Sequence, residues 1–152
     1  MKKISLLISM LLISGFTFAQ EGEAPLHKGQ KQLNFGLGSG YNGLPVYGGV
    51  DFAVSNDVTI GPVLQMRFDN EDKYINLGGV FRGDYHFNRI IGIPNNFDFY
   101  AGGSLGFFTG GNGLYLSAQV GGRWYWDEKW GLNVELGGGT GYGGAIGVSM
   151  KF

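Results

Sequence analysis

The 152-residue chain contains no cysteine, so disulfide bonds, thiolate metal ligands and a thiol nucleophile are excluded. It also has little charge: Asp, Glu, Lys and Arg make up 15% of the residues, whereas soluble domains usually carry about 25%. Glycine, by contrast, occurs 30 times, and aromatic residues reach 15%. A chain of this composition would have a poorly solvated exterior in water, whereas the same composition is expected for a protein surrounded by lipid.

The long apolar run near the N-terminus is too short for a membrane-spanning helix. It extends from Ile4 to Phe18, follows Lys2 and Lys3, and ends in the small residue Ala19. These features predict a secretory signal peptide over residues 1–19, cleaved between Ala19 and Gln20. Because no cysteine follows the run, a lipoprotein is excluded.

The mature chain is expected to contain a polar, flexible leader at residues 20–30 and one domain at residues 31–152. Removing Lys2 and Lys3 from the 11 basic residues leaves nine against 12 acidic residues, a net charge near −3. This charge argues against nucleic-acid binding.

The domain divides into segments of about ten residues, the length that a tilted strand needs to cross a bilayer. Within each segment apolar and polar or small residues alternate, as a strand with two different faces requires. In one such segment Val58, Ile60 and Leu64 share a face opposite Thr59 and Gly61. The predicted strands are 31–41, 46–55, 58–68, 74–88, 97–109, 114–127, 130–139 and 142–152.

Eight strands of this kind predict an all-β fold, an antiparallel up-and-down transmembrane β-barrel whose interior is filled by side chains. A soluble periplasmic, lipocalin-like binding barrel would show the same alternation with the apolar face turned inward. The second face is dominated by glycine and small residues with scattered charges. That face suits a crowded interior better than a solvated exterior.

The links between the strands predict an orientation in which both termini are periplasmic. The periplasmic turns are then 56–57, 89–96 and 127–129, and the outer links are 42–45, 69–73, 110–113 and 139–143. With this arrangement an aromatic girdle is expected at the periplasmic interface. Its members are Phe52, Tyr85, Phe87, Phe97, Phe99, Trp124, Trp126, Trp130 and Phe152.

The chain ends in Val148-Ser149-Met150-Lys151-Phe152, an aromatic last residue preceded by apolar residues at alternate positions. Together with the eight alternating segments, this end resembles the small bacterial outer-membrane β-barrel proteins related to OmpX and the OmpA barrel domain, over residues 30–152. The resemblance implies a location in the cell outer membrane, among its lipid and lipopolysaccharide. It also implies that the barrel-assembly machinery recognises Phe152 as an assembly signal. The chain departs from OmpX in lacking long protruding outer strands.

The inward charges are predicted to form a polar network in the lumen, because isolated charges in a narrow interior would be expensive. Acidic and basic residues are expected to balance and to pair, with His86 facing Asp98 and Arg123 reaching Glu135 diagonally across a hairpin. The predicted network consists of Asp51, Arg67, Arg82, Asp84, His86, Asp98, Arg123, Glu135 and Lys151.

No reactive constellation emerges from the sequence, so we expect no catalysis, no cofactor and no metal site. Gly102-Gly103-Ser104-Leu105-Gly106 matches the G-x-S-x-G pattern of hydrolases, but that pattern needs a strand-to-helix turn and a later histidine. Both histidines, His27 and His86, precede it. The expected function is a structural or envelope-interaction role for a monomer. The alternatives are a narrow channel for small solutes or ions, a lipid-modifying outer-membrane enzyme, and the soluble binding barrel.

Overall fold

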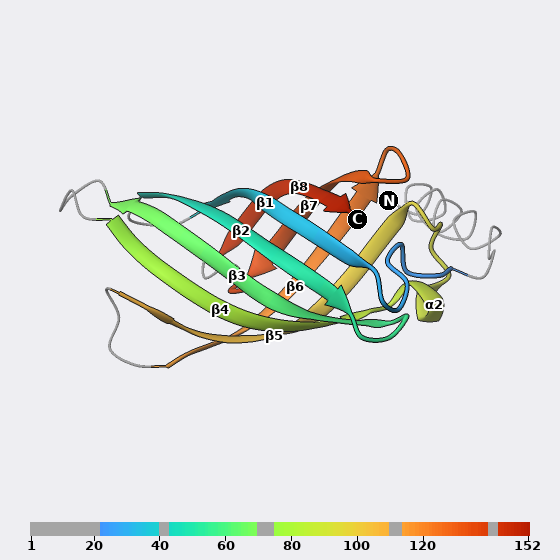
Figure 1. The fold of residues 1–152 in the computed structure, drawn as a ribbon, viewed down its shortest axis with the longest axis horizontal. Helices are drawn as coiled ribbons and strands as arrows, with labels where there is room; N and C mark the ends of the chain where they lie inside the picture. The colour runs from blue at the N-terminus through green and yellow to red at the C-terminus, as the bar shows by residue number, and fades with distance from the viewer. Residues whose placement is uncertain (1–21, 40–42, 70–74, 110–113, 140–142) are drawn as a thin grey trace, which may run out of the picture.

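The computed structural model describes residues 22–39, 43–69, 75–109, 114–139 and 143–152, which form one closed antiparallel barrel of eight strands. Each strand pairs with the next along the chain, and β1 closes the barrel against β8 (Figure 1). The predicted fold class is therefore confirmed. The strands are β1 (Lys31–Ser39), β2 (Gly43–Ala53), β3 (Val58–Asp69), β4 (Ile75–His86), β5 (Phe97–Phe108), β6 (Tyr115–Tyr125), β7 (Trp130–Gly137) and β8 (Gly144–Lys151).

Strand β6 shows how the alternation of the sequence becomes the two faces of the wall. Gln119 and Arg123 are buried in the interior, whereas Val120 and Trp124 are exposed on the outside. Pairing with β7 places Trp124 opposite Leu132, so that apolar residues meet on the outer face. A register slip of one residue would turn every such side chain to the wrong face, which strongly specifies the observed register.

One end of the barrel carries the start of β1, the end of β8 and the helix α2 (Asn88–Ile91), at the right in Figure 1. We refer to it as the α2 end. The links 54–57, 87–96 and 126–129 lie at this end. Residues 40–42, 70–74, 110–113 and 140–142, which include parts of all four predicted outer links, fall outside the described ranges, as do Ala19 and Gln20 at the predicted cleavage site.

Several strand ends differ from the predicted bounds by one to three residues, and two links were predicted wrongly. β2 begins at Gly43 rather than at residue 46, because Leu44 and Pro45 continue the outward and inward alternation of the strand. Pro45 therefore lies in β2 rather than in the predicted turn, since proline is tolerated near a strand end. The link 89–96 is also more than a turn, since it contains part of α2, which ends at Ile91 and is followed by Gly92 in the left-handed conformation. Within the described residues, neither α2 nor any other helix has the length and apolar composition needed to cross a membrane.

The leader differs from the expected flexible segment over residues 22–30, which lie against the α2 end. Ala24 and Leu26 are 3% and 4% exposed. The backbone N–H of Lys28 donates to Asn56 Oδ1 at 3.1 Å, and Lys151 Nζ donates to the carbonyl of Pro25 at 3.4 Å. These partners belong to separate strands and links, so the leader crosses the end of the barrel. Although the leader is polar on average, it contains the short apolar stretch from Ala24 to Leu26, which is buried at the α2 end.

Candidate functional site

The candidate site is the interior of the barrel, where every strand contributes polar side chains. Because inward positions recur every second residue, each strand delivers a column of side chains to the same narrow space. The buried polar residues that the structure describes on the strands include Gln32, Asn34, Asp51, Thr59, Gln65, Arg82, Asp84, His86, Asp98, Ser104, Gln119, Arg123, Asn133, Glu135 and Ser149.

Arg82 is the centre of one group of contacts. Its Nε atom lies 2.7 Å from Asp84 Oδ2, and its Nη2 atom lies 2.7 Å from Glu135 Oε2. Gln119 Nε2 donates to Asp84 Oδ1 at 2.9 Å, and the hydroxyl of Tyr100 donates to Glu135 Oε2 at 2.9 Å. Since Arg82 is on β4 and Glu135 is on β7, this group ties opposite walls of the barrel together.

Arg123 is the centre of a second group. Its Nη1 atom donates to Asp98 Oδ2 at 2.9 Å, and its Nη2 atom donates to Asp51 Oδ2 at 2.8 Å. The predicted pairing of Arg123 with Glu135 was therefore wrong. Asp98 lies directly opposite Arg123 in the register. Glu135 lies opposite Gly121 and instead forms an ion pair with Arg82 across the lumen. A directly opposite partner is closer than a diagonal one.

Tyr100 lies between the two arginine groups. Its ring centroid is 4.1 Å from Arg123 Cζ and 5.4 Å from Arg82 Cζ, distances at which a guanidinium group interacts favourably with an aromatic face. The ring fits because residue 121 is glycine: a Cβ atom at that position would lie 2.3 Å from Tyr100 Cζ. Tyr100 thus fills the middle of the lumen.

The structure brings His86 and Asp98 together, with His86 Nδ1 2.7 Å from Asp98 Oδ1. On the other side of the imidazole ring, Nε2 lies 3.0 Å from Thr59 Oγ1. This order of hydroxyl, imidazole and carboxylate resembles that of a catalytic triad. All three side chains are nearly fully buried, however, and Asp98 also binds Arg123, so the arrangement fits a satisfied structural chain.

The two remaining predicted residues, Arg67 and Lys151, are partly exposed. Arg67 lies beside Asn76 in the register of β3 and β4. Lys151 lies at the α2 end, where its Nζ atom is 4.2 Å from the centroid of the Tyr125 ring.

A neutral hydrogen-bonded chain was missing from the predicted network. Asn34 Nδ2 donates to Asp51 Oδ2 at 2.9 Å, and the Oγ atom of Ser149 donates to Asn34 Oδ1 at 2.7 Å. Asn133 Nδ2 donates to Ser149 Oγ at 2.9 Å, and the hydroxyl of Tyr47 donates to Asn133 Oδ1 at 2.7 Å. The alternation of the strands places these residues inward, but the pairing of charges from which the network was predicted gives no information about uncharged side chains.

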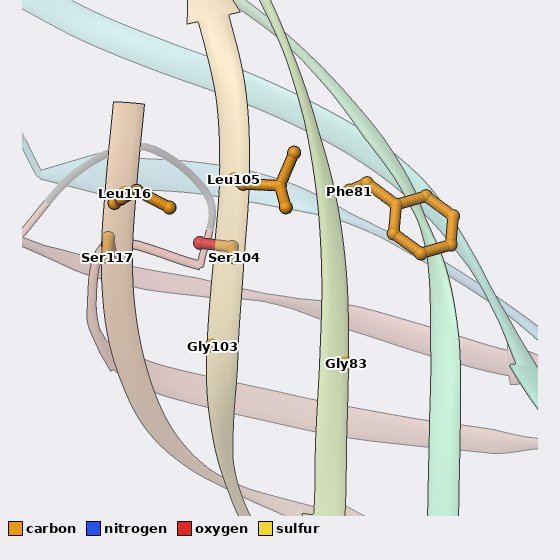
Figure 2. A pocket seen from close by; sticks show the side chains of 7 residues that line it. All are labelled: Phe81, Gly83, Gly103, Ser104, Leu105, Leu116 and Ser117. Atoms are coloured by element: carbon orange, nitrogen blue, oxygen red, sulfur yellow. The ribbon is translucent and has the colours of Figure 1, made fainter. Parts of the chain in front are cut away.

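Ser104 does not form a nucleophile elbow. It lies in the middle of β5, which continues to Phe108 without a turn into a helix, and its Oγ atom donates to the carbonyl of Gly138 at 3.3 Å. A shallow hollow in the outer wall lies beside it (Figure 2). The hollow is lined by Phe81, Gly83, Gly103, Ser104, Leu105, Leu116 and Ser117. Over the described ranges, the structure contains no group of three or more His, Cys, Asp or Glu residues able to hold a metal ion.

No protein-family model matches the chain, and no curated protein matches its sequence. Solved structures are similar at low identity. The N-terminal β-barrel domain of OprF from Pseudomonas aeruginosa is 15% identical, with a TM-score of 0.65, and the match covers 82% of this chain and 98% of that one. The outer membrane protein Ail of Yersinia pestis, in a phospholipid bilayer nanodisc, is 10% identical with a TM-score of 0.54, covering 82% and 100%.

A de novo designed transmembrane β-barrel, solved by solution NMR, is 18% identical to this chain with a TM-score of 0.61. That match covers 88% of this chain and 98% of the designed one. The eight-stranded closure, the polar interior and these similarities agree, and the chain has the fold of the small eight-stranded transmembrane β-barrels, as its resemblance to the OmpX and OmpA barrels implied.

Proposed function

We propose that this chain is a small outer-membrane β-barrel with a structural or envelope-interaction role and without catalysis. The observation that carries the proposal is the inverted distribution of side chains, with charges inside and large apolar groups exposed on the outer wall of every strand. Water disfavours such a wall, whereas hydrocarbon accommodates it. The exposed apolar side chains include one from each strand, in the order β1 to β8: Leu37, Val46, Leu64, Phe81, Leu105, Leu116, Val134 and Ile146.

An aromatic belt at the α2 end supports a membrane location. Most members of the predicted girdle are exposed on the outer wall: Phe52, Tyr85, Phe97, Phe99, Trp124, Trp126 and Phe152. Aromatic rings favour the boundary between lipid and water. The same distribution argues against the soluble binding barrel, which needs its apolar face inside.

Cell fractionation combined with gel mobility tests the location. We expect the mature protein in the outer-membrane fraction, and we expect its migration in SDS gels to change on boiling, because a closed barrel resists SDS until heated. Recovery as a soluble periplasmic protein would contradict the proposal.

The filled lumen argues against the channel alternative. Tyr100, Arg82 and Arg123 cross the interior and are each less than 5% exposed. An eight-stranded barrel encloses a space that side chains just fill. We therefore expect no steady conductance when the purified protein is inserted into planar bilayers that give open-channel currents with a water-filled porin. Reproducible ohmic steps from this chain would favour the channel.

Among the residues that the structure describes, the buried Thr59, His86 and Asp98 are the arrangement that could favour a lipid-modifying enzyme. Their burial inside the wall separates them from lipid on the outside, so we expect identical lipid A mass profiles with and without the protein. A new deacylated or acylated species that disappears in His86→Ala would favour the enzyme.

The partners that we propose follow from the same location. Outer-membrane lipid and lipopolysaccharide would surround the apolar wall, and the barrel-assembly machinery would recognise the C-terminal end. A monomer is expected, because the described strands close into a barrel without an unpaired edge at which another copy could join.

A further inference from the structure

The short helix α2 carries two large apolar side chains that the described part of the protein does not cover. Ile90 is 66% exposed and Ile91 is 46% exposed, although both lie in a link between strands rather than on the outer wall. Single exposed isoleucines are common on protein surfaces and need no explanation. Their role is therefore decided by the surface to which they belong.

The opposite face of α2 is held against the barrel. Asn88 is fully buried, and its Nδ2 atom donates to the carbonyl of Phe97 at 2.6 Å. Its Oδ1 atom accepts from the N–H of Phe99 at 3.2 Å. Ile90 follows Asn88 by two positions, which is a rotation of about 200° around a helix axis. Ile90 is thus turned away from β5 while the helix itself is fixed in place.

Phe87 connects the two isoleucines to the aromatic belt. The N–H groups of Ile90 and Ile91 donate to the carbonyl of Phe87 at 2.9 Å and 3.0 Å, and residues three and four positions apart share one face of a helix. The centroid of the Phe87 ring lies 5.0 Å from that of Tyr85 and 5.9 Å from that of Phe99. Tyr85 and Phe99 are exposed on the outer wall. The apolar face of α2 therefore continues the lipid-facing wall.

The size of α2 matches the boundary region of a membrane. The helix adjoins the strand ends (Figure 1) and, with four residues, spans at most about 6 Å in any orientation. The polar region of a bilayer is about 5 to 8 Å thick on each side of the hydrocarbon core. Because α2 begins directly after the aromatic belt, it lies within this region, where apolar side chains of a helix pack between headgroups and acyl chains.

We propose that Ile90 and Ile91 bind the membrane itself, packing into the boundary between phospholipid headgroups and acyl chains at the α2 end. This inference rests on the membrane location proposed above and extends the contact with lipid from the strands to a link. Movement of the barrel along the membrane normal toward the α2 end would expose both isoleucines to water. The helix therefore helps to fix the depth of the barrel in the bilayer.

Fluorescence quenching of a label at position 90 tests the contact, and the absence of cysteine from the chain allows single-cysteine variants without background. Ile90→Cys carries a bimane label in barrels refolded into phosphatidylcholine vesicles. The quenchers are iodide in the water and lipids with a spin label either near the headgroup or near the chain end. We expect strong quenching by the headgroup-proximal spin label and weaker quenching by the deep one. Ile91→Cys repeats the measurement at the neighbouring position.

Two matched variants calibrate the depth. Glu128→Cys places the label in the exposed link between β6 and β7 at the same end, and iodide should quench it severalfold more strongly than the label at position 90. Leu105→Cys places the label on the outer wall, six residues beyond Phe99 along β5. On a tilted strand this is about 15 Å, half the thickness of the hydrocarbon core. The deep spin label should quench it most.

The outcomes separate this inference from the membrane location on which it rests. If iodide reaches the label at position 90 as readily as the label at Glu128→Cys, while the label at Leu105→Cys stays protected, the inference is overturned and the location stands. Iodide access to the label at Leu105→Cys would overturn both. Protection of position 90 that falls as the lipid-to-protein ratio rises would mean that a second copy of the chain covers α2, which also overturns the inference.

Discussion

At the scale of single residues, Arg82 and Arg123 each hold two carboxylates in the interior. Neither arginine is more than 4% exposed, so water screens these contacts little. A buried ion pair adds little to the stability of a protein compared with apolar packing at the same place. Removing one partner, however, lowers the stability strongly, because the other charge is left buried without a counter-charge.

Arg82→Ala is therefore expected to lower the free energy of unfolding by about 3 to 5 kcal/mol, since Asp84 and Glu135 would lose their common partner. Urea titration of the folded barrel in lipid vesicles measures this change. Arg89→Ala is the control: the Arg89 side chain is 54% exposed, with Nη2 3.4 Å from Asp57 Oδ1, and its loss should cost less than about 1 kcal/mol. Similar losses in the two variants would contradict the buried-pair interpretation.

The ion pair between Arg82 and Glu135 leads to a second prediction for single residues. In a double-mutant cycle, Arg82→Met and Glu135→Gln together should cost less than the sum of the single changes, by about 0.5 to 3 kcal/mol, because the two groups are in contact. The same cycle with Arg123→Met and Glu135→Gln should give the smaller coupling energy. A larger coupling energy for the second pair would restore the pairing predicted from the sequence.

At the scale of elements, the links at the α2 end are held by side chains bonded to backbone groups. Asn88 is fully buried, donates through Nδ2 to the carbonyl of Phe97 at 2.6 Å and accepts from the N–H of Phe99 at 3.2 Å. Its Nδ2 atom also lies 3.4 Å from the carbonyl of Glu23. One side chain thus joins α2, β5 and the leader.

Asn88→Ala should lower the free energy of unfolding by about 1 to 3 kcal/mol, because it leaves partly buried backbone groups without their side-chain partner. Amide hydrogen exchange should also become faster in residues 22–30. Asn95→Ala serves as the control, since the exposed Asn95 only accepts one bond, from the N–H of Glu23. Unchanged exchange in the leader of Asn88→Ala would show that other contacts hold it.

The β6–β7 turn has a dependence on pH that follows from Asp127. The backbone N–H groups of Trp130 and Lys129 donate to its carboxylate at 2.6 Å and 2.7 Å and hold the pKa of Asp127 below its ordinary value of 3.8. A pKa lowered by folding means that the carboxylate stabilises the fold above the unfolded-state pKa. This contribution is lost as the pH falls through the lower folded-state value.

Asp127→Ala should therefore be less stable than the wild type at neutral pH, and the difference should shrink as the pH falls below about 4. Urea unfolding across this pH range measures it, with the neighbouring exposed Glu128→Ala as the control. A difference that stays constant into strong acid would mean that the charge of Asp127 is not responsible.

At the scale of the whole molecule, closure of the barrel depends on its two ends. Phe152 N donates to the carbonyl of Lys31 at 2.9 Å, and Lys31 N donates to the carbonyl of Phe152 at 3.3 Å, so the last residue extends the seam between β1 and β8. The Phe152 side chain itself is 60% exposed on the outer wall.

Deletion of Phe152 should reduce outer-membrane levels in cells far more than it reduces refolding of the purified protein into vesicles. The expected reason is that the exposed ring serves recognition by the assembly machinery, whereas the seam loses only a terminal pair of hydrogen bonds. Trp126→Ala removes an aromatic side chain of similar exposure at the same end and should assemble nearly normally. Normal levels of the truncated protein would argue against an assembly signal.

The sequence by itself determined the strands, their number and which side chains point inward, because alternation is a local property that each strand repeats. It did not reveal the packing of Ala24 and Leu26, since the surface that buries them forms only when the barrel closes. It also did not reveal the start of β2 at Gly43, because Pro45 is a common turn residue. The partners of Arg123 were also decided by the tertiary structure. Strand register and closure bring Asp51, four strands away, within reach of the guanidinium group, and no pattern along one chain measures a distance across a lumen.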